Sequence, residues 1–311
     1  MSPSMVNAVY YPSWGVYGGK PPSCLDAAAI THVFYAFVRV NENGTLRLLD
    51  EFGDLVKDVD GEKGCLAALG KFKRQHPHIK TLVSLGGGSG SAEFPKLAAS
   101  ETARETFATE ARSFCDRYGF DGIDIDWEHP QTPTQGLDYV RLLESARSTL
   151  PPSKYLLSTA LPVGEYSLGQ IDLESAARLL DFLNLMCYDF VGGWTNSCSG
   201  GVEYLLSRNV PSHKILLGIP TYARYFPHAQ GPGQSSLDAG EMDIRALPDA
   251  WFKGASASLP SASSLTERVS FSDFITSVTL DRTQTRPNLT RLPKRRCCFK
   301  LSKYSQGYSG N

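Results

Sequence analysis

Short runs of β-branched and aromatic residues recur along the first two thirds of the chain, and helix-like stretches separate them. The runs are apolar at successive positions, which predicts strands that are buried on both faces. Their spacing of roughly 25 to 45 residues is typical of βα units that form a parallel sheet. Seven strands are predicted, over residues 6–11, 32–40, 79–85, 122–127, 155–160, 182–188 and 214–220.

One of the intervening helices can be predicted in detail from its apolar residues. They recur at spacings of three and four, and they are Ala103, Phe107, Ala111, Phe114 and Tyr118. Residues with this spacing share one face of a helix. Gly119 follows them and is a candidate for the C-terminal cap. We expect this apolar face to pack on the sheet.

Parallel βα units either close into a barrel or spread into an open doubly wound sheet. The positions of polar residues favour the barrel, because barrel enzymes collect their chemistry at the carboxyl ends of the strands. Four predicted strands are followed by such groups, namely Gly86 with Gly87, Asp126 with Glu128, Tyr188 with Asp189, and Tyr222 with Arg224. We therefore predict an α/β fold, a (β/α)8 TIM barrel over residues 1–255 that is incomplete or irregular at the eighth strand.

The last part of the chain has a different composition, because the βα rhythm fades after about residue 251. Residues 254–264 are rich in serine, and residues 281–311 hold eight Lys or Arg against a single acid, Asp281. We predict that residues 256–311 form an atypical C-terminal segment, with a weak eighth strand over 274–280 and a basic, disordered tail. A disordered tail is favoured over a nucleic-acid-binding arm.

The net charge of the chain indicates which classes of binding partner are compatible with it. The 311 residues carry a formal net charge of -1, so no global field attracts a nucleic acid or an acidic membrane, whereas a neutral sugar is compatible. The sequence has no long apolar run of the length that a membrane-spanning helix needs. The N-terminus shows no basic region followed by an apolar core, so we expect a cytoplasmic monomer, or an extracellular one if the N-terminus is incomplete.

Seven cysteines are scattered along the chain without a Cys-x-x-Cys pair. This pattern predicts neither a disulfide framework nor a zinc site. We therefore expect neither a metal nor another cofactor.

Acidic and apolar residues alternate in residues 121–128, so a strand would place them on opposite faces. We expect Asp124, Asp126 and Glu128 to point into the barrel while their apolar neighbours pack beneath the helices. Crowded, poorly solvated carboxyl groups cannot all ionise, so at least one should keep a proton near neutral pH. Glycoside cleavage needs such a general acid together with a second carboxylate. Glu128 is the last and longest of the three, and it should reach furthest toward the rim.

Two other interpretations of these acids are open. The first is an amphipathic strand with a wetted acidic face, which is common in antiparallel sheets. The second is a Mg²⁺ or Ca²⁺ site, since oxygen clusters bind these cations. The metal site is disfavoured because no His stands at another strand end to complete it.

The segment Asp121-Gly-Ile-Asp124-Ile-Asp126-Trp-Glu128 resembles the signature of glycoside hydrolase family 18, the family of chitinases and related endo-N-acetylglucosaminidases. Three further segments resemble the family's patterns on its third, sixth and seventh strands. They are Ser84-Leu-Gly-Gly87, Met186-Cys-Tyr-Asp189 and Gly218-Ile-Pro-Thr-Tyr-Ala-Arg224. Their order and spacing fit the family over residues 6–250.

The resemblance implies a retaining mechanism in which the substrate's own N-acetyl group is the nucleophile. Glu128 would protonate the leaving oxygen and later activate water. Asp126 would orient the acetamide and stabilise the oxazolinium ion, while Asp124 would hydrogen-bond Asp126 and share its proton. Tyr188 would donate a hydrogen bond to the acetamide carbonyl. The implied substrate is chitin or a chitooligosaccharide.

A second set of residues is predicted to contact the sugar. Flat apolar sugar faces suit aromatic rings, and tight glycine turns can shape the rim of a site. These considerations predict that the substrate contacts Tyr11, Trp14, Phe37, Gly86, Gly87 and Trp194. The resemblance implies that the sugar sites are also lined by Met186, Asp189, Tyr222 and Arg224.

One family feature is not matched, because no Trp follows Trp251, whereas the family carries a Trp on its eighth strand. This departure leaves open a chitooligosaccharide-binding protein with reduced or no turnover. An endo-β-N-acetylglucosaminidase that acts on N-glycans shares the acidic strand and is a further alternative. The Met-x-Tyr-Asp segment favours chitin.

Overall fold

The computed structural model describes residues 6–189, 198–225 and 240–243. The chain divides after Pro220 into two compact units, and each is described by itself. The predictions for Trp194, for a weak eighth strand at 274–280 and for the C-terminal tail lie outside the described residues.

The first unit is built on one sheet whose main strands are all parallel and follow one another in chain order. These strands are β1 (Ala8–Pro12), β2 (His32–Val40), β6 (Lys80–Gly86), β7 (Gly122–Asp126), β8 (Leu156–Pro162), β9 (Phe182–Met186) and β10 (Ile215–Leu217). A short strand, β3 (Leu46–Leu48), pairs antiparallel with β2. The seven predicted strands and the parallel α/β class are confirmed, with bounds that differ by a few residues.

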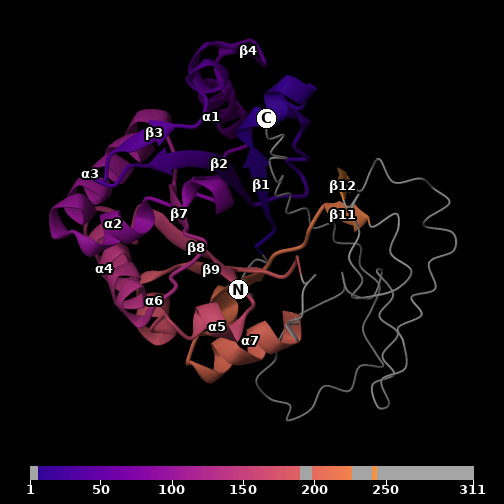
Figure 1. The fold of residues 1–311 in the computed structure, drawn as a ribbon. Helices are drawn as coiled ribbons and strands as arrows, with labels where there is room; N and C mark the ends of the chain where they lie inside the picture. The colour runs from indigo at the N-terminus through magenta and orange to yellow at the C-terminus, as the bar shows by residue number, and fades with distance from the viewer. Residues whose placement is uncertain (1–5, 190–197, 226–239, 244–311) are drawn as a thin grey trace, which may run out of the picture. The chain divides into compact units, whose positions relative to one another are not determined.

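Helices cover the outer side of this sheet. They are α1 (Cys65–Gln75), α2 (Phe94–Ala99), α3 (Glu101–Tyr118), α4 (Pro133–Thr149), α5 (Glu165–Leu168), α6 (Leu173–Leu179) and α7 (Cys198–Ser207). Figure 1 shows α3, α4 and α6 side by side along the strands β7, β8 and β9. In the described ranges no helix is long and apolar enough to cross a membrane.

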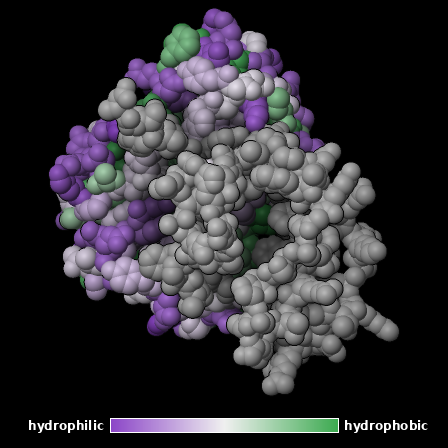
Figure 2. Space-filling model, turned by 45° about the vertical axis from the view of Figure 1, so that its right-hand side comes forward, coloured by the Kyte–Doolittle hydropathy of each residue, from purple (hydrophilic) through white to green (hydrophobic). Residues whose placement is uncertain are grey.

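Short segments complete the first unit. They are η1 (Ser13–Gly18), η2 (Pro22–Cys24), η3 (Phe52–Val56), η4 (Gly88–Gly90) and η5 (Ser212–Lys214), with the two-stranded hairpin β4 (Asp58–Val59) and β5 (Glu62–Lys63). Most of the described surface in Figure 2 is hydrophilic, and hydrophobic residues are scattered on it. Scattered apolar side chains are ordinary on a folded surface.

The sheet is curled like the wall of a barrel. Tyr10 on β1 and Asn184 on β9 belong to strands that are not neighbours in the sheet, yet Asn184 Nδ2 donates to Tyr10 Oη at 2.9 Å. At the N-terminal ends of β2 and β9, the rings of His32 and Phe182 meet edge to face with their centroids 5.3 Å apart. Contacts across the concave side require curvature, so the described strands form a half-barrel.

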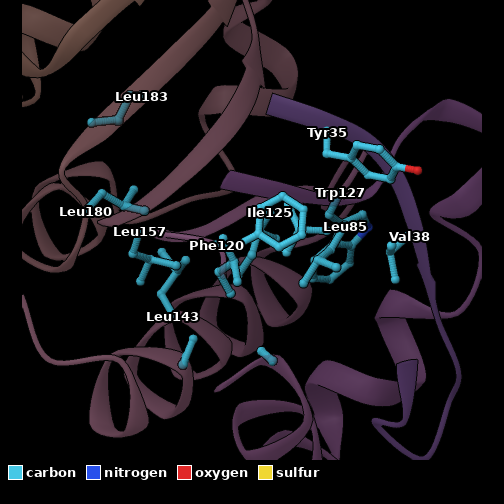
Figure 3. Packing of buried hydrophobic residues seen from close by; sticks show 14 of the residues in the cluster. Tyr35, Val38, Leu85, Phe120, Ile125, Trp127, Leu143, Leu157, Leu180 and Leu183 are labelled. Carbon is cyan, nitrogen blue, oxygen red and sulfur yellow. The ribbon is translucent and has the colours of Figure 1, made fainter. Parts of the chain in front are cut away.

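Alternate residues of each strand face the two sides of the sheet. Ile123 and Ile125 are fully buried on the convex side, in the core between strands and helices that Figure 3 shows. The Trp127 ring stacks on Phe94 with centroids 5.6 Å apart and contacts Tyr139 of α4. The prediction that the apolar residues of this segment pack beneath the helices is confirmed.

Helix α3 also confirms its prediction. Ser100 caps its N-terminus by accepting a hydrogen bond from the Ala103 amide at 3.3 Å. At its other end Gly119 has φ 74°, the left-handed conformation that ends many helices. The buried residues Ala103, Phe107 and Ala111 lie on its predicted apolar face.

Candidate active site

Three acids run along β7 and its continuation. Asp124 and Asp126 have no exposed surface, whereas Glu128 is partly exposed just beyond the end of the strand. The acids therefore extend from the interior of the half-barrel to the carboxyl end of the strands. This is the end at which barrel enzymes place their chemistry.

Asp124 is held by side chains from four other strands. Its Oδ2 accepts hydrogen bonds from Tyr10 Oη at 2.9 Å and Ser84 Oγ at 2.7 Å. Its Oδ1 accepts from Ser158 Oγ at 2.7 Å and Asn184 Nδ2 at 3.1 Å. Hydrogen bonds to a charged acceptor are strong, and they allow a carboxylate to be buried.

Tyr10 is a donor that keeps its proton. Burial, followed by the charges of Asp124 and Asp126, raises the pKa of Tyr10 well above its usual value. The ring stacks on Phe34 with centroids 4.7 Å apart, which fixes its direction. At any physiological pH Tyr10 is therefore a neutral phenol that can donate to Asp124.

The chain turns sharply at Gly86 and Gly87, where β6 ends. Their φ angles are 110° and 80°, which L side chains rarely adopt. A Cβ on Gly86 would lie 2.4 Å from the carbonyl oxygen of Asp126, and one on Gly87 would lie 3.0 Å from the Phe37 ring. The two glycines are needed because the backbone passes so close to the acidic strand and to Phe37.

Ser91 joins this turn to the acidic strand. Its Oγ accepts a hydrogen bond from the backbone amide of Glu128 at 2.8 Å. The same oxygen lies 2.9 Å from the Gly87 carbonyl oxygen and 3.3 Å from that of Asp126. A Cβ on Gly88 would lie 3.7 Å from Glu128 Oε2, so the turn also passes beside the carboxyl group of Glu128. Ser91 therefore helps to fix the position of Glu128.

The end of β9 brings other predicted residues to the same side. Met186 is almost completely buried on the strand, Tyr188 is partly buried just beyond it, and Asp189 is exposed with φ 58°. A Cβ on Gly218 would lie 2.9 Å from the Tyr188 ring, so Gly218 leaves the space that the ring occupies.

The predicted aromatic contacts divide into two groups. Trp14 is partly exposed, and its ring lies 6.3 Å from that of the buried Phe37. Tyr11 points to the opposite face of β1 from Tyr10 and is buried in the outer core, where its hydroxyl donates to the Lys20 carbonyl. A ring enclosed in this way offers no face to a sugar, so the assignment of Tyr11 as a sugar contact is corrected to that of a core residue.

Tyr222 and Arg224 lie in the second unit. They belong to β11 (Tyr222–Tyr225), which pairs antiparallel with β12 (Gly240–Asp243). Their role in substrate binding stays a prediction. Over the described parts of the chain, no group of three or more His, Cys, Asp or Glu residues is arranged to bind a metal.

Sequence reasoning missed several polar residues around the acids. Tyr10, Ser158 and Asn184 hold Asp124, and Ser91 holds Glu128. A signal for the first three was present, because each is a polar residue within a strand that is otherwise apolar. A buried polar residue needs a partner, so each marked a contact inside the barrel.

Comparison with known proteins identifies the class to which this fold and site belong. The family described as "Glycosyl hydrolases family 18" matches residues 6–285. The chain belongs to this family.

Chitinase 1 of Aphanocladium album is 34% identical over 289 residues, which cover 78% of this chain and 68% of that protein. Endochitinase 1 of Metarhizium robertsii is 32% identical, with coverage of 79% and 68%. Among solved structures, chitinase ChiA74 from Bacillus thuringiensis has a TM-score of 0.64 at 28% identity, over 71% of this chain and 49% of that one.

The Ostrinia furnacalis Group IV chitinase in complex with allosamidin has a TM-score of 0.68 at 25% identity, over 81% of this chain and 79% of that one. The present chain thus spans about two thirds of the length of Chitinase 1 and of Endochitinase 1, and about half of the Bacillus chitinase.

Proposed function

We propose that this chain hydrolyses the β-1,4 bonds of chitin or chitooligosaccharides with retention of configuration, using the acetamide of the substrate as the nucleophile. The observation that carries the proposal is the row of three acids, two fully buried and the third partly exposed at the strand end. The chitinases among its relatives support the choice of substrate.

In the first step, the acetamide oxygen of the sugar attacks the anomeric carbon while the glycosidic bond breaks. The proton of Glu128 passes to the leaving oxygen, and the sugar becomes an oxazolinium ion. Asp126 lies two residues before Glu128 on the same side of the strand, where it would orient the acetamide N–H and stabilise the positive charge. Tyr188 would donate to the acetamide carbonyl oxygen.

In the second step, the Glu128 carboxylate takes a proton from water as the water oxygen attacks the anomeric carbon. The oxazolinium ring opens, which restores the acetamide and the protonated Glu128. The same residue acts as acid and then as base, as microscopic reversibility requires. Its partial exposure suits both roles, because the leaving sugar and the incoming water must each reach it.

The test is release of a chromophore from chitobiose or chitotriose conjugates. Glu128→Gln keeps the size of the side chain but removes its acid, so its turnover should fall about 100-fold or more. Glu144→Gln is the matched control, because Glu144 is exposed on α4. Equal turnover by wild type and Glu128→Gln would overturn the proposal.

A second outcome points to a different function. The alternative is a chitooligosaccharide-binding protein, since no Trp follows Trp251 in the sequence. Calorimetry that detects chitotriose binding while wild-type hydrolysis stays at background would support that function instead. Release of whole glycans from a glycoprotein would favour the endo-β-N-acetylglucosaminidase alternative.

A further inference from the structure

Two cysteines meet where α7 covers the end of β9. From β9, Leu183 and Leu185 face the helices and belong to the outer core. Cys187 follows just beyond the strand and belongs to the same core, with 6% of its surface exposed. Its side chain therefore lies on the side of the sheet that the helices cover.

The face of α7 that packs on this core begins with Cys198. Leu205, about two turns further along the helix, is fully buried in the core, and Cys198 packs against the same core. A Cβ on Gly201 would lie 3.2 Å from the Leu185 side chain, so α7 lies directly against the outer face of β9. The packing of the helix thus brings the Cys198 thiol to Cys187.

The two thiols are in contact, and the structure has both in the free form. Cys198 Sγ lies 3.8 Å from the carbonyl oxygen of Cys187, and the two thiol groups hydrogen-bond to each other. This hydrogen bond lowers the pKa of Cys198 and raises that of Cys187, because the Cys187 proton stabilises the Cys198 thiolate. Cys198 is also the more exposed of the two. Since the thiolate is the nucleophile, Cys198 is the more reactive partner.

The other buried thiols that the structure describes have different surroundings. Cys65 Sγ lies 3.7 Å from Tyr11 Oη, and Cys115 Sγ lies 3.5 Å from the carbonyl oxygen of Gly122. Burial raises the pKa of Cys65 to about 11 and that of Cys115 to about 12. Buried thiols of this kind are inert.

We propose that Cys187 and Cys198 are a reversible disulfide site, oxidised by exchange with a low-molecular-weight disulfide such as oxidised glutathione. The bond joins the end of β9 to the first residue of α7. The proposal goes beyond the hydrolysis proposed above and does not depend on it.

The exchange takes place in two steps. The Cys198 thiolate attacks one sulfur of oxidised glutathione, which breaks the sulfur–sulfur bond and releases one glutathione thiolate. Cys187 then loses its proton and attacks Cys198 Sγ, and the second glutathione thiolate leaves. The two protein thiols lose two electrons, the glutathione disulfide gains them, and the two released thiolates take up the two protons. A dithiol reagent reverses both steps.

The disulfide should stabilise the fold. A cross-link restricts the unfolded chain, and the two sulfurs need only approach to about 2 Å from their present contact. Cys198 is partly exposed at the start of its helix, so its side chain is the one that can adjust. We expect oxidation to raise the melting temperature of the full chain by about 5 °C or more.

The experiment treats the reduced full chain with oxidised glutathione and identifies the products by mass spectrometry. No Lys or Arg lies between Arg178 and Arg208, so trypsin releases one peptide, residues 179–208, that contains both cysteines. In the wild type this peptide should lose the mass of two hydrogens and resist alkylation. Dithiothreitol should restore the two thiols and the lower melting temperature.

Variants assign the two roles. In Cys187→Ser, Cys198 should keep glutathione as a stable mixed disulfide, because no second thiol displaces it. In Cys198→Ser, the buried Cys187 should stay reduced. Neither variant should gain melting temperature on oxidation. Cys24→Ser is the control, since Cys24 is exposed on η2, and it should behave like the wild type at both positions.

The result can contradict the proposal in two ways. If the folded wild type keeps both thiols in peptide 179–208, or if Cys198 pairs with a cysteine other than Cys187, the disulfide site is refuted. Should Cys187→Ser fail to fold, Cys198→Ser carries the test, because its side chain is the less buried one. None of these measurements needs turnover, so a chain that hydrolyses nothing can still confirm the disulfide.

Discussion

Another buried aspartate, Asp54 on η3, provides a quantitative test of the structure outside the candidate site. Its side chain is 1% exposed, the Tyr35 hydroxyl donates to its Oδ1, and its Oδ2 has no hydrogen-bond partner among the described residues. Burial raises the pKa of Asp54 from its usual 3.8 to about 6. The folded protein therefore retains this proton to a higher pH than the unfolded chain does.

The sign of the effect on stability follows from linkage. Between about pH 4 and pH 6 Asp54 binds more protons in the folded state than in the unfolded state, so its contribution to stability falls as the pH rises through this range. Above about pH 6 the loss is complete, and a pKa difference of about two units corresponds to about 3 kcal/mol. Asp54→Asn keeps the shape and the acceptor for Tyr35 but cannot ionise. We expect it to unfold at higher urea than wild type near pH 8 and at about the same urea near pH 4.

Urea unfolding followed by tryptophan fluorescence at the two pH values measures this difference. The stability of Asp54→Asn must be compared with that of wild type at the same pH. His32 changes the stability of both proteins in the opposite direction over part of this pH range. Asp172→Asn is the control, since Asp172 is a largely exposed helix cap whose pKa is lowered by its hydrogen bonds to Ser175. If the stabilities of wild type and Asp54→Asn run parallel from pH 4 to pH 8, the burial argument is refuted.

Two further predictions concern Gly86 and His32. Gly86→Ala places a Cβ 2.4 Å from the Asp126 carbonyl oxygen and 2.7 Å from the Phe94 ring, so it should lower the free energy of unfolding by about 2–4 kcal/mol and reduce chitotriose turnover. Gly119→Ala, where φ is also positive but no atom lies within 4 Å of the new Cβ, should lose only about 1–2 kcal/mol and no turnover; equal losses would contradict the steric argument. Burial lowers the pKa of His32 to about 4, so the contribution of His32 to stability should fall as the pH drops from about 6.5 to 4, opposite in direction to that of Asp54. His32→Gln should remove this fall in thermal melts, and an unchanged slope would contradict it.

The sheet could be predicted from the sequence because its strands are buried on both faces. Continuous apolar runs such as residues 32–40 stand out from the amphipathic helices, and βα spacing indicates the parallel order. The end of β10 could not be predicted. The apolar sequence continues to Pro220, yet the strand ends at Leu217, where Gly218 leaves room for the Tyr188 ring. The Tyr188 ring follows another strand, β9, so the local sequence around Gly218 does not reveal this contact.

The acids of the candidate site could be predicted because charged residues at alternate positions are unusual in a buried strand. Their partners are harder to assign. Ser158 and Asn184 stand out as polar residues in apolar strands, but the sequence does not say which groups they contact, and the pair formed by Tyr10 and Asn184 joins positions 174 residues apart in the chain. Only the curvature of the sheet brings them together. Tyr11 was misassigned because the sequence does not say which of two successive tyrosines faces inward, and Tyr10 is the one that does.

A comparison of Asp54 with Asp124 shows how the number of hydrogen-bond donors decides the ionisation of a buried acid. An unpaired buried charge destabilises a protein by several kcal/mol, whereas each hydrogen bond to a charged group stabilises it by about 1.5–3 kcal/mol. One oxygen of Asp54 accepts a hydrogen bond from a phenol, and the other has no partner within the described residues. Burial therefore raises the pKa of Asp54 to about 6, and the acid keeps its proton up to that pH. Asp124 accepts two hydrogen bonds on each oxygen, so it can be equally buried and still ionised. A donor removed from Asp124 should therefore affect stability and the acid limb of activity together, because both depend on the same carboxylate.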